Sequence, residues 1–271
     1  MIAVSTKASY RRVARTALRE GGVTEGERAV PEEVPVAFSY GGSTHAVMMA
    51  SPADLVDFAV GFSLTEGIIS VKADIRAIEV VEAGQGYDVQ VDLQDTNADA
   101  LRARRRHMAG PVGCGLCGIE SIEQAVRVVP DLNDVKISVG GHDIVAAMKA
   151  LNEAQSLNRE TRAVHGAGFY DARKGLLAAR EDVGRHNALD KLAGAVINAE
   201  LPSHAGIVAV TSRLSVEMVQ KTAILGSPIL AAISAPTALA IETAEKAGVT
   251  LVALVRGEEF EIFTRAERII L

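Results

Sequence analysis

The sequence of 271 residues contains no tryptophan and only two cysteines, and aromatic residues make up 4% of it. Because large rings are scarce, small aliphatic side chains must fill the interior, which favours an α/β protein over an all-β sandwich. No run of about 18 uninterrupted apolar residues occurs, so we expect no transmembrane helix. The net charge of −6 argues against non-specific nucleic-acid binding, which depends on basic residues that neutralise phosphates.

The N-terminus carries a twin arginine, Arg11-Arg12, but no apolar segment follows it. A secretory or twin-arginine signal is therefore not expected, and we predict a cytoplasmic protein. The first nineteen residues are basic and lack acidic residues, which weakly resembles a transit peptide. The better interpretation is a flexible, solvated N-terminal tail over residues 1–30. In the cytoplasm two cysteines are more often catalytic or metal-binding than a structural disulfide.

The rest of the chain is predicted to form two α/β regions. Alternating hydrophobic segments around glycine-containing turns predict an N-terminal α+β region over 31–112. Residues 113–134 are predicted to form a cysteine loop and a following helix. Short apolar strands that alternate with helices predict a parallel sheet covered on both faces, in a three-layer α/β/α domain over 135–271.

The expected strands lie at 34–40, 44–49, 75–82, 87–93, 163–170, 175–180, 206–210, 228–233, 249–255 and 259–263. The expected helices lie at 51–67, 97–108, 119–129, 143–155, 187–199, 214–225 and 238–246. Ser51 is the predicted N-cap of the first helix, because Pro52 follows it and Asp54 comes three residues later.

The two cysteines stand together in the glycine-rich segment Gly113-Cys114-Gly115-Leu116-Cys117-Gly118. A structural zinc site needs four ligands, and no pair of histidines with zinc-like spacing completes these two. A zinc deaminase pairs Pro-Cys-x-x-Cys with an upstream His-x-Glu, whereas here Gly113 precedes Cys114 and the glutamate is missing. Simple dithiol exchange and a pair of inert buried thiols both stay open as alternatives.

Sulfur transfer fits the cysteine segment best. The thiolate is the reactive form, and a free cysteine with a pKa of about 8.5 is mostly protonated at neutral pH. Cys117 lies one residue before a predicted helix, whose N-terminus would stabilise an anion, and the arginines at 102–106 would add positive charge. A persulfide on one cysteine could be displaced by the other or passed outward. Cys114 and Cys117 are therefore the candidate catalytic residues.

Polar residues follow three predicted parallel strands, at the point where each strand ends. Ligands of open α/β sheets bind beyond the carboxyl ends of the strands, and helix N-termini with Ser, Thr and Arg suit phosphate. Ordinary N-capping explains Ser234 and Thr237. Arg213 and Arg256 are harder to explain in this way, although surface salt bridges remain an alternative. We expect an anion to bind at this edge of the sheet.

The densest polar run of the chain lies at 180–191 and includes His186. It mixes charges of both signs with histidine, asparagine and glycine at the start of a helix that soon becomes apolar. We interpret this run as a segment that orders a ligand, with a solvated charged face as the alternative. No Walker-type phosphate loop and no dinucleotide-binding glycine motif occurs.

These features resemble the formate dehydrogenase accessory sulfurtransferases of the FdhD type. The resemblance covers nearly the whole chain after the tail. It is carried by 32–35, 45–49, 57–67, 113–121, 180–191, 212–213, 234–236 and 255–257.

The resemblance implies a sulfurtransferase that acts as a protein persulfide carrier required for formate dehydrogenase activity, and not as a multi-turnover metabolic enzyme. Such proteins accept persulfide sulfur from a cysteine desulfurase and transfer it to the bis-molybdopterin guanine dinucleotide form of the molybdenum cofactor, before that cofactor enters formate dehydrogenase. The resemblance further implies a cytidine-deaminase-like fold for the C-terminal domain without zinc, and a homodimer. The alternative is a non-catalytic chaperone that only binds and delivers the cofactor.

Carried onto this sequence, the resemblance makes Cys114 the persulfide carrier and Cys117 its partner. The predicted cofactor-binding residues are Leu254, Val255, Arg256, Gly257, Glu258, Glu259, Ser212, Arg213 and His186. Guanine nucleotide is expected to mimic the cofactor, and no metal, nucleic acid or membrane is expected to bind. Family members commonly have a glycine-rich stretch before the histidine that corresponds to His165. This chain has residues 161–164 there instead, so we leave His165 out of the predicted site.

Overall fold

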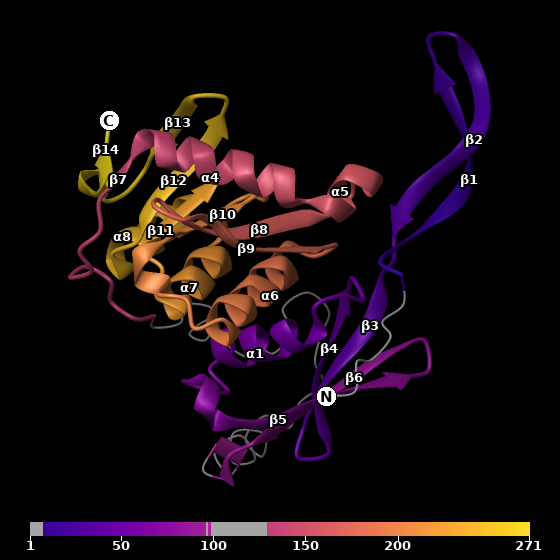
Figure 1. Cartoon of the computed structure of the whole chain (residues 1–271), viewed down its shortest axis with the longest axis horizontal. Coiled ribbons are helices and arrows are strands. Elements are labelled where there is room, and N and C mark those ends of the chain that lie inside the picture. The colour runs from indigo at the N-terminus through magenta and orange to yellow at the C-terminus, as the bar shows by residue number, and fades with distance from the viewer. Residues whose placement is uncertain (1–7, 96, 99–128) are drawn as a thin grey trace.

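The computed structural model of the chain describes residues 8–95, 97–98 and 129–271. An N-terminal lobe (residues 34–98) and a C-terminal lobe (residues 129–271) each contain a sheet covered by helices, and they pack together through helices α1 (Leu55–Thr65) and α6 (Arg185–Asn198) (Figure 1). No helix in the described part of the chain is both long enough and apolar enough to cross a membrane.

The N-terminal lobe is an antiparallel and parallel sheet with α1 on one face. Its strands are β3 (Val34–Tyr40), β4 (Ser43–Ala50), β5 (Ile75–Ala83) and β6 (Gly86–Leu93), in the order β4-β3-β6-β5. Gly41 and Gly42 join β3 to β4 with φ of 57° and 76°, which only glycine adopts without strain. Phe38 of β3 packs against Phe58 and Phe62 of α1 in the core. Both predicted hairpins are therefore present.

The C-terminal lobe contains a six-stranded sheet in the order β13-β12-β11-β10-β8-β9. Its strands are β8 (His165–Asp171), β9 (Gly175–Asp182), β10 (Ile207–Val210), β11 (Ile229–Ala232), β12 (Thr250–Arg256) and β13 (Glu259–Ile262). Only β10, β11 and β12 are parallel to one another. The parallel sheet predicted from the alternation of strands and helices is therefore present. The segments at 163–170 and 175–180, which we expected to form a hairpin, pair antiparallel as β8 and β9, and β13 pairs antiparallel with β12 because a short turn joins them.

Helices cover both faces of this sheet, as predicted. Helix α4 (Gly141–Ala154), followed by α5 (Ser156–Thr161), lies on one face, and α6, α7 (Val216–Leu225) and α8 (Ala238–Ala247) lie on the other (Figure 1). Alternation along β10 explains the three layers: Val208 and Val210 pack with α6 and α7, whereas Ile207 and Ala209 pack with α4. Two short strands, β7 (Val139–Gly140) and β14 (Ile269–Ile270), pair with each other. Three 3₁₀ turns connect longer elements: η1 (Lys72–Asp74), η2 (Ser203–Ala205) and η3 (Ala266–Arg268).

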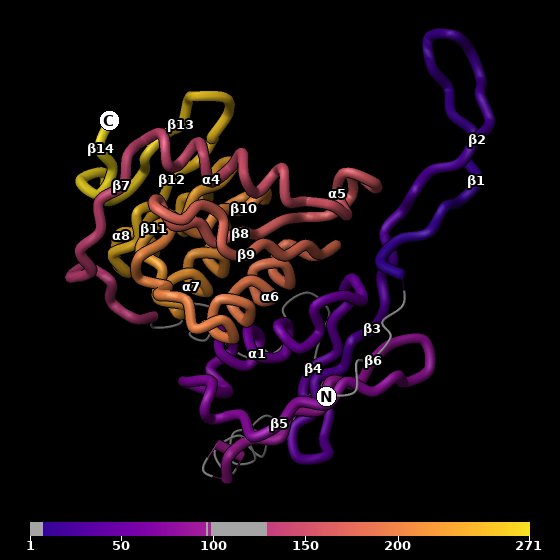
Figure 2. The backbone as a smooth tube through the Cα atoms, viewed as in Figure 1, coloured from indigo at the N-terminus to yellow at the C-terminus, as the bar shows by residue number. Residues whose placement is uncertain are grey.

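A hairpin of two long strands stands where we expected a flexible tail. Strands β1 (Tyr10–Arg19) and β2 (Gly22–Pro31) pair along their whole length and project from the body of the molecule (Figures 1 and 2). The tail prediction over 1–30 is therefore wrong for the paired residues. It rested on composition, whereas Gly22, with φ of 103°, supplies the tight turn that lets the two segments pair.

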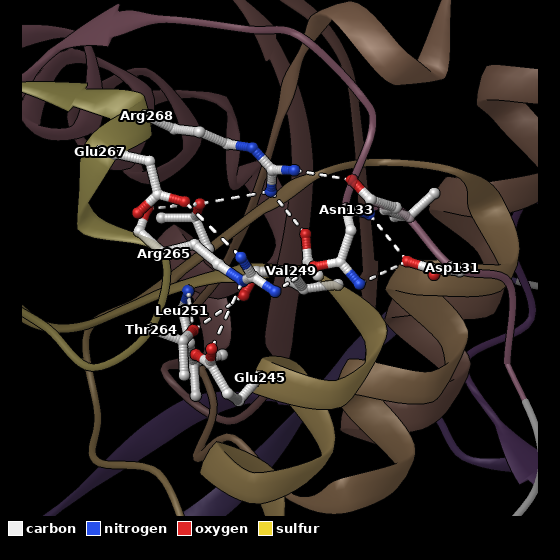
Figure 3. Close-up of polar contacts among 12 residues, drawn as sticks. Asp131, Asn133, Glu245, Val249, Leu251, Thr264, Arg265, Glu267 and Arg268 are labelled. Carbon is white, nitrogen blue, oxygen red and sulfur yellow. Dashed lines mark hydrogen bonds and ion pairs between the residues drawn. The ribbon is translucent and has the colours of Figure 1, made fainter.

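A buried arginine of η3 connects this turn to residues 132 and 133. The Arg268 guanidinium donates to the backbone oxygens of Leu132, at 2.6 Å, and of Gly248, while Arg265 bonds the Asn133 side chain (Figure 3). Burial lowers the pKa of Arg268 from its ordinary value. We name Leu132, Asn133, Arg265 and Arg268 the Arg268 anchor, since their contacts hold residues 132 and 133 against η3.

Candidate functional site

The carboxyl ends of β10, β11 and β12 lie side by side at one edge of the six-stranded sheet, which we call the carboxyl edge. The start of β8 reaches the same edge, because β8 runs antiparallel to β10. Thr211, directly after β10, donates from its backbone to the Gly166 oxygen at 3.0 Å. The Gly166 amide donates in return to Thr211 Oγ1 at 2.9 Å. This pair places His165, which precedes Gly166, beside the end of β10.

Ser212 and Arg213 follow Thr211 and differ in exposure. Ser212 is buried, and its hydroxyl donates to the Arg213 backbone oxygen at 3.1 Å. Its hydroxyl therefore serves the local backbone. Arg213 is exposed and forms no ion pair with any other residue that the structure describes. The alternative of a surface salt bridge thus has no support at Arg213, and its guanidinium is available to an anion.

Residues 254–259 comprise the end of β12, the turn at 257–258 and the first residue of β13, at the same edge. Leu254 has φ of 55° and Gly257 has φ of 59°, and the strand pairing shifts register between Ala253 and Arg256. The Leu254 amide donates to the Ser234 oxygen at 3.4 Å, which connects the turn to the end of β11. Within the described chain Arg256 is exposed and has no ion-pair partner. The predicted residues 254–259 and 212–213 therefore lie at one edge, as the strand-end argument requires.

His186 joins this edge from the turn between β9 and α6. Its Nε2 lies 3.7 Å from the Glu217 Oε2 of α7, and Ser215 donates to the same carboxylate oxygen at 2.7 Å. The pKa of His186 is lowered from its ordinary value to about 4, mainly by burial and also by the positive charge of Arg185, while the charge of Glu217 opposes the shift. The imidazole is therefore neutral at neutral pH.

Two polar atoms in the first two residues of α6 are buried and make no hydrogen bond to any residue of the described chain. They are His186 Nε2 and Arg185 Nε. Buried polar groups are nearly always paired, so two unsatisfied atoms in neighbouring residues are consistent with a position that binds a ligand. Arg185 carries a permanent positive charge next to His186 in the chain, and this charge favours an anionic ligand.

His165 lies within the influence of the same arginine. Burial lowers the pKa of His165, and the charge of Arg185 lowers it further while Asp182 opposes the shift. The structure thus places His165 at the carboxyl edge, although we left it out of the predicted site. Arg185 was missed too, and the signal for it was its place directly before His186. Glu217 could not have been found from the sequence, because only the packing of α7 against α6 brings it to His186.

Other predictions lie outside the described residues. These are Cys114, Cys117, the arginines at 102–106, the helix at 119–128 and most of the helix at 97–108. Among the described residues, no group of three or more His, Cys, Asp or Glu side chains could hold a metal ion.

Comparison with known proteins gives consistent results over nearly the whole chain. The model of the FdhD/NarQ family matches residues 31–270. A protein of Agrobacterium fabrum named sulfur carrier protein FdhD is 84% identical over 271 residues, which is 100% of each chain. A protein of the same name from Brucella abortus is 57% identical over 260 residues, covering 96% of this chain and 97% of its own.

A solved structure has the same overall arrangement. The crystal structure of a candidate formate dehydrogenase accessory protein from Desulfotalea psychrophila aligns with a TM-score of 0.77 at 26% identity. The alignment covers 97% of this chain and 100% of the other. The similarity therefore includes both lobes.

Proposed function

Because the chain belongs to the FdhD/NarQ family, we propose that it is a sulfur carrier required for formate dehydrogenase activity. The observation that carries this proposal is the 84% identity, over the full length of both chains, with a protein named sulfur carrier protein FdhD.

The proposed sulfur transfer uses the two cysteines in sequence. A thiolate at Cys114 attacks the outer sulfur of a persulfide on a cysteine desulfurase, and the desulfurase cysteine leaves as a thiolate. Once the acceptor is bound, Cys117 attacks the inner sulfur of the Cys114 persulfide. This step forms a disulfide between the two cysteines and releases the outer sulfur as hydrosulfide. A cellular dithiol reductant then supplies the two electrons that reduce this disulfide and restore both thiols.

The acceptor in this proposal is the bis-molybdopterin guanine dinucleotide cofactor, held at the carboxyl edge. Its diphosphates carry negative charge, which matches Arg213, Arg256 and Arg185. The unsatisfied atoms of Arg185 and His186 support the same ligand class. Glu258 and Glu259 are exposed acidic residues in the turn, so we assign anion contacts there to the backbone and to Arg256.

The remaining parts of the proposal concern fold and context. We propose a cytidine-deaminase-like arrangement for the C-terminal lobe, supported by its mixed sheet between two helical layers. We further propose that the protein is a homodimer in the cytoplasm and that formate dehydrogenase is the final recipient of the cofactor.

The test is to incubate the purified protein with a cysteine desulfurase and cysteine and to measure its intact mass. We expect a gain of one sulfur atom that a thiol reductant removes, and we expect Cys114→Ala to prevent it. No reducible adduct on the unmodified protein would overturn the carrier function. If Cys114→Ala also left formate dehydrogenase activation unchanged while cofactor binding survived, the protein would be a chaperone that only delivers the cofactor.

A further inference from the structure

Asp182, the last residue of β9, receives hydrogen bonds from three separate parts of the chain. It is fully buried. One carboxylate oxygen, Oδ1, accepts from the Gly184 amide at 2.8 Å and from Asn187 Nδ2 at 2.9 Å. The other, Oδ2, accepts from the Ser51 amide at 3.0 Å and from Lys191 Nζ at 2.6 Å. A carboxylate with four donors in the interior is held in one orientation.

Ser51 of the N-terminal lobe completes the arrangement. Its hydroxyl accepts from the Val183 amide at 3.2 Å, and its backbone oxygen accepts from Lys191 Nζ at 2.9 Å. Both backbone amides of the turn, Val183 and Gly184, are therefore satisfied by Ser51 and Asp182. This explains why the predicted role of Ser51 as a helix N-cap is wrong: α1 begins at Leu55, and Ser51 serves the other lobe instead.

The turn between β9 and α6 has little freedom to relax. A Cβ atom on Gly184 would lie 2.8 Å from Asn187 Nδ2 and 3.4 Å from Asp182 Oδ1. Asn187 Nδ2 also donates to the backbone oxygen of Met49, at 2.9 Å, in the N-terminal lobe. The two residues that follow Gly184 are Arg185 and His186, whose unsatisfied atoms lie at the carboxyl edge. The placement of Arg185 and His186 thus depends on the hydrogen bonds that Asp182 accepts from Gly184, before them, and from Asn187, after them.

We propose that Asp182, together with Ser51 and Lys191, is a positioning residue that holds Arg185 and His186 in the orientation needed to bind the nucleotide. Through Ser51 the N-terminal lobe is part of the site in the C-terminal lobe. This inference rests on the proposed function for the identity of the ligand, but the positioning itself can be measured without a ligand.

The experiment compares Asp182→Asn with Asp57→Asn. Asp57 is also a carboxylate between the two lobes, since it accepts from Arg180 Nη2 at 2.6 Å and from Asn198 Nδ2 at 2.8 Å. None of its hydrogen bonds involves the turn or Lys191. The control therefore weakens the contact between the lobes without disturbing the turn.

The first readout is the titration of His186, followed by NMR of histidine-labelled protein. The charges that act on His186 come from Arg185, Glu217, Lys221 and Glu66, and Asp182 is not among them. Loss of a nearby negative charge would in any case lower the pKa of a histidine. A rise of the His186 pKa from about 4 toward its ordinary value in Asp182→Asn therefore reports that the imidazole has become exposed. We expect this rise in Asp182→Asn and no rise in Asp57→Asn.

The second readout is the affinity for guanosine diphosphate (GDP), measured by calorimetry at a temperature where each variant is folded. We expect about tenfold weaker binding in Asp182→Asn, because a small displacement of binding groups costs that much or more. If Asp182→Asn does not fold, Ser51→Ala is measured in its place, because it removes only the hydroxyl that accepts from the Val183 amide. About threefold weaker binding is expected there, with a smaller rise of the His186 pKa.

The outcomes separate the two proposals. An unchanged His186 pKa and unchanged GDP affinity in the folded Asp182 variant, or in Ser51→Ala if that variant is used, would refute the positioning role. If the unmodified protein did not bind GDP, the cofactor site would be refuted, and the His186 titration would still decide whether Asp182 positions the turn. Equal effects of Asp57→Asn and Asp182→Asn on His186 would also refute the proposal.

Discussion

Lys221 Nζ lies 2.8 Å from Asp190 Oδ1, and this buried pair connects α7 to α6. The same ammonium donates to Thr65 Oγ1 at 2.9 Å, at the end of α1. Three helices from two lobes therefore converge on one lysine. Thr65 Oγ1 lies 2.6 Å from Asp190 Oδ1, which completes the hydrogen bonding of the group.

Lys221→Met should strongly destabilise the protein, because it leaves the Asp190 carboxylate buried without its counter-charge. Removal of one partner of such a pair costs roughly 3–5 kcal/mol in the free energy of unfolding. Urea denaturation at neutral pH measures it. Lys149→Met, on the exposed surface of α4, is the control and should change stability by less than about 0.5 kcal/mol. Equal stabilities of the two variants would contradict the assigned role of the pair.

The stability of the protein should fall as the pH falls below the ordinary pKa of histidine. The folded state holds the pKa of His186 at about 4, so protons bind the unfolded state more readily between that value and about 6.5. Stability is then full above about pH 6.5, and we expect it to drop by about 2 kcal/mol from pH 7 to pH 5 through this residue.

Urea denaturation of His186→Gln at both pH values isolates that contribution. The variant keeps His165, whose pKa is also lowered by burial, so its own loss of stability between the two pH values serves as the baseline. The unmodified protein should lose more stability than the variant over this range. An identical loss in both proteins would show that His186 is exposed in solution.

Gly61→Ala should destabilise the protein even though alanine is the better helix former. A Cβ atom on Gly61 would lie 1.7 Å from the Asp190 backbone oxygen, because α1 and α6 pack backbone to backbone. The helices must separate, and such overpacking costs about 1–3 kcal/mol or more. Gly26→Ala, where no atom lies within 4 Å of the added Cβ, is the matched substitution and should be nearly neutral in thermal unfolding. A neutral Gly61→Ala would mean that the helices lie farther apart.

Arg213→Ala and Arg256→Ala should each weaken GDP binding by about three- to tenfold, because each removes a charge-assisted contact to phosphate. Calorimetry at low and at moderate salt measures the affinity, and the difference between variants should shrink as salt rises. Arg173→Ala is the control, since Arg173 is an exposed arginine in the turn between β8 and β9, at the opposite edge of the sheet. Unchanged affinity in both test variants would remove these arginines from the site.

Much of the fold could be predicted because its signals are local. The apolar run at 206–210 and the glycines that follow α7 and α8, Gly226 and Gly248, mark β10, α7 and α8 within two residues of their observed limits. The contacts that form the site are not local. The sequence predicted Ser51 as an N-cap, whereas in the structure the Ser51 amide donates to Asp182, 131 positions away. No local pattern of residue types predicts a partner so far away in the sequence. For the same reason, only the structure could show that Arg185 and Glu217 lie at His186.

The Arg268 anchor determines when the protein can finish folding during its synthesis. Leu132 and Asn133 bond to Arg268 and Arg265, which lie 136 and 132 positions further along the chain (Figure 3). Domains fold as their segments emerge from the ribosome, and contacts between distant segments form late. The N-terminal lobe has its strands and α1 by residue 93, so it can form first. Residues 132 and 133, in contrast, cannot close these contacts until residues 265 and 268 have been made.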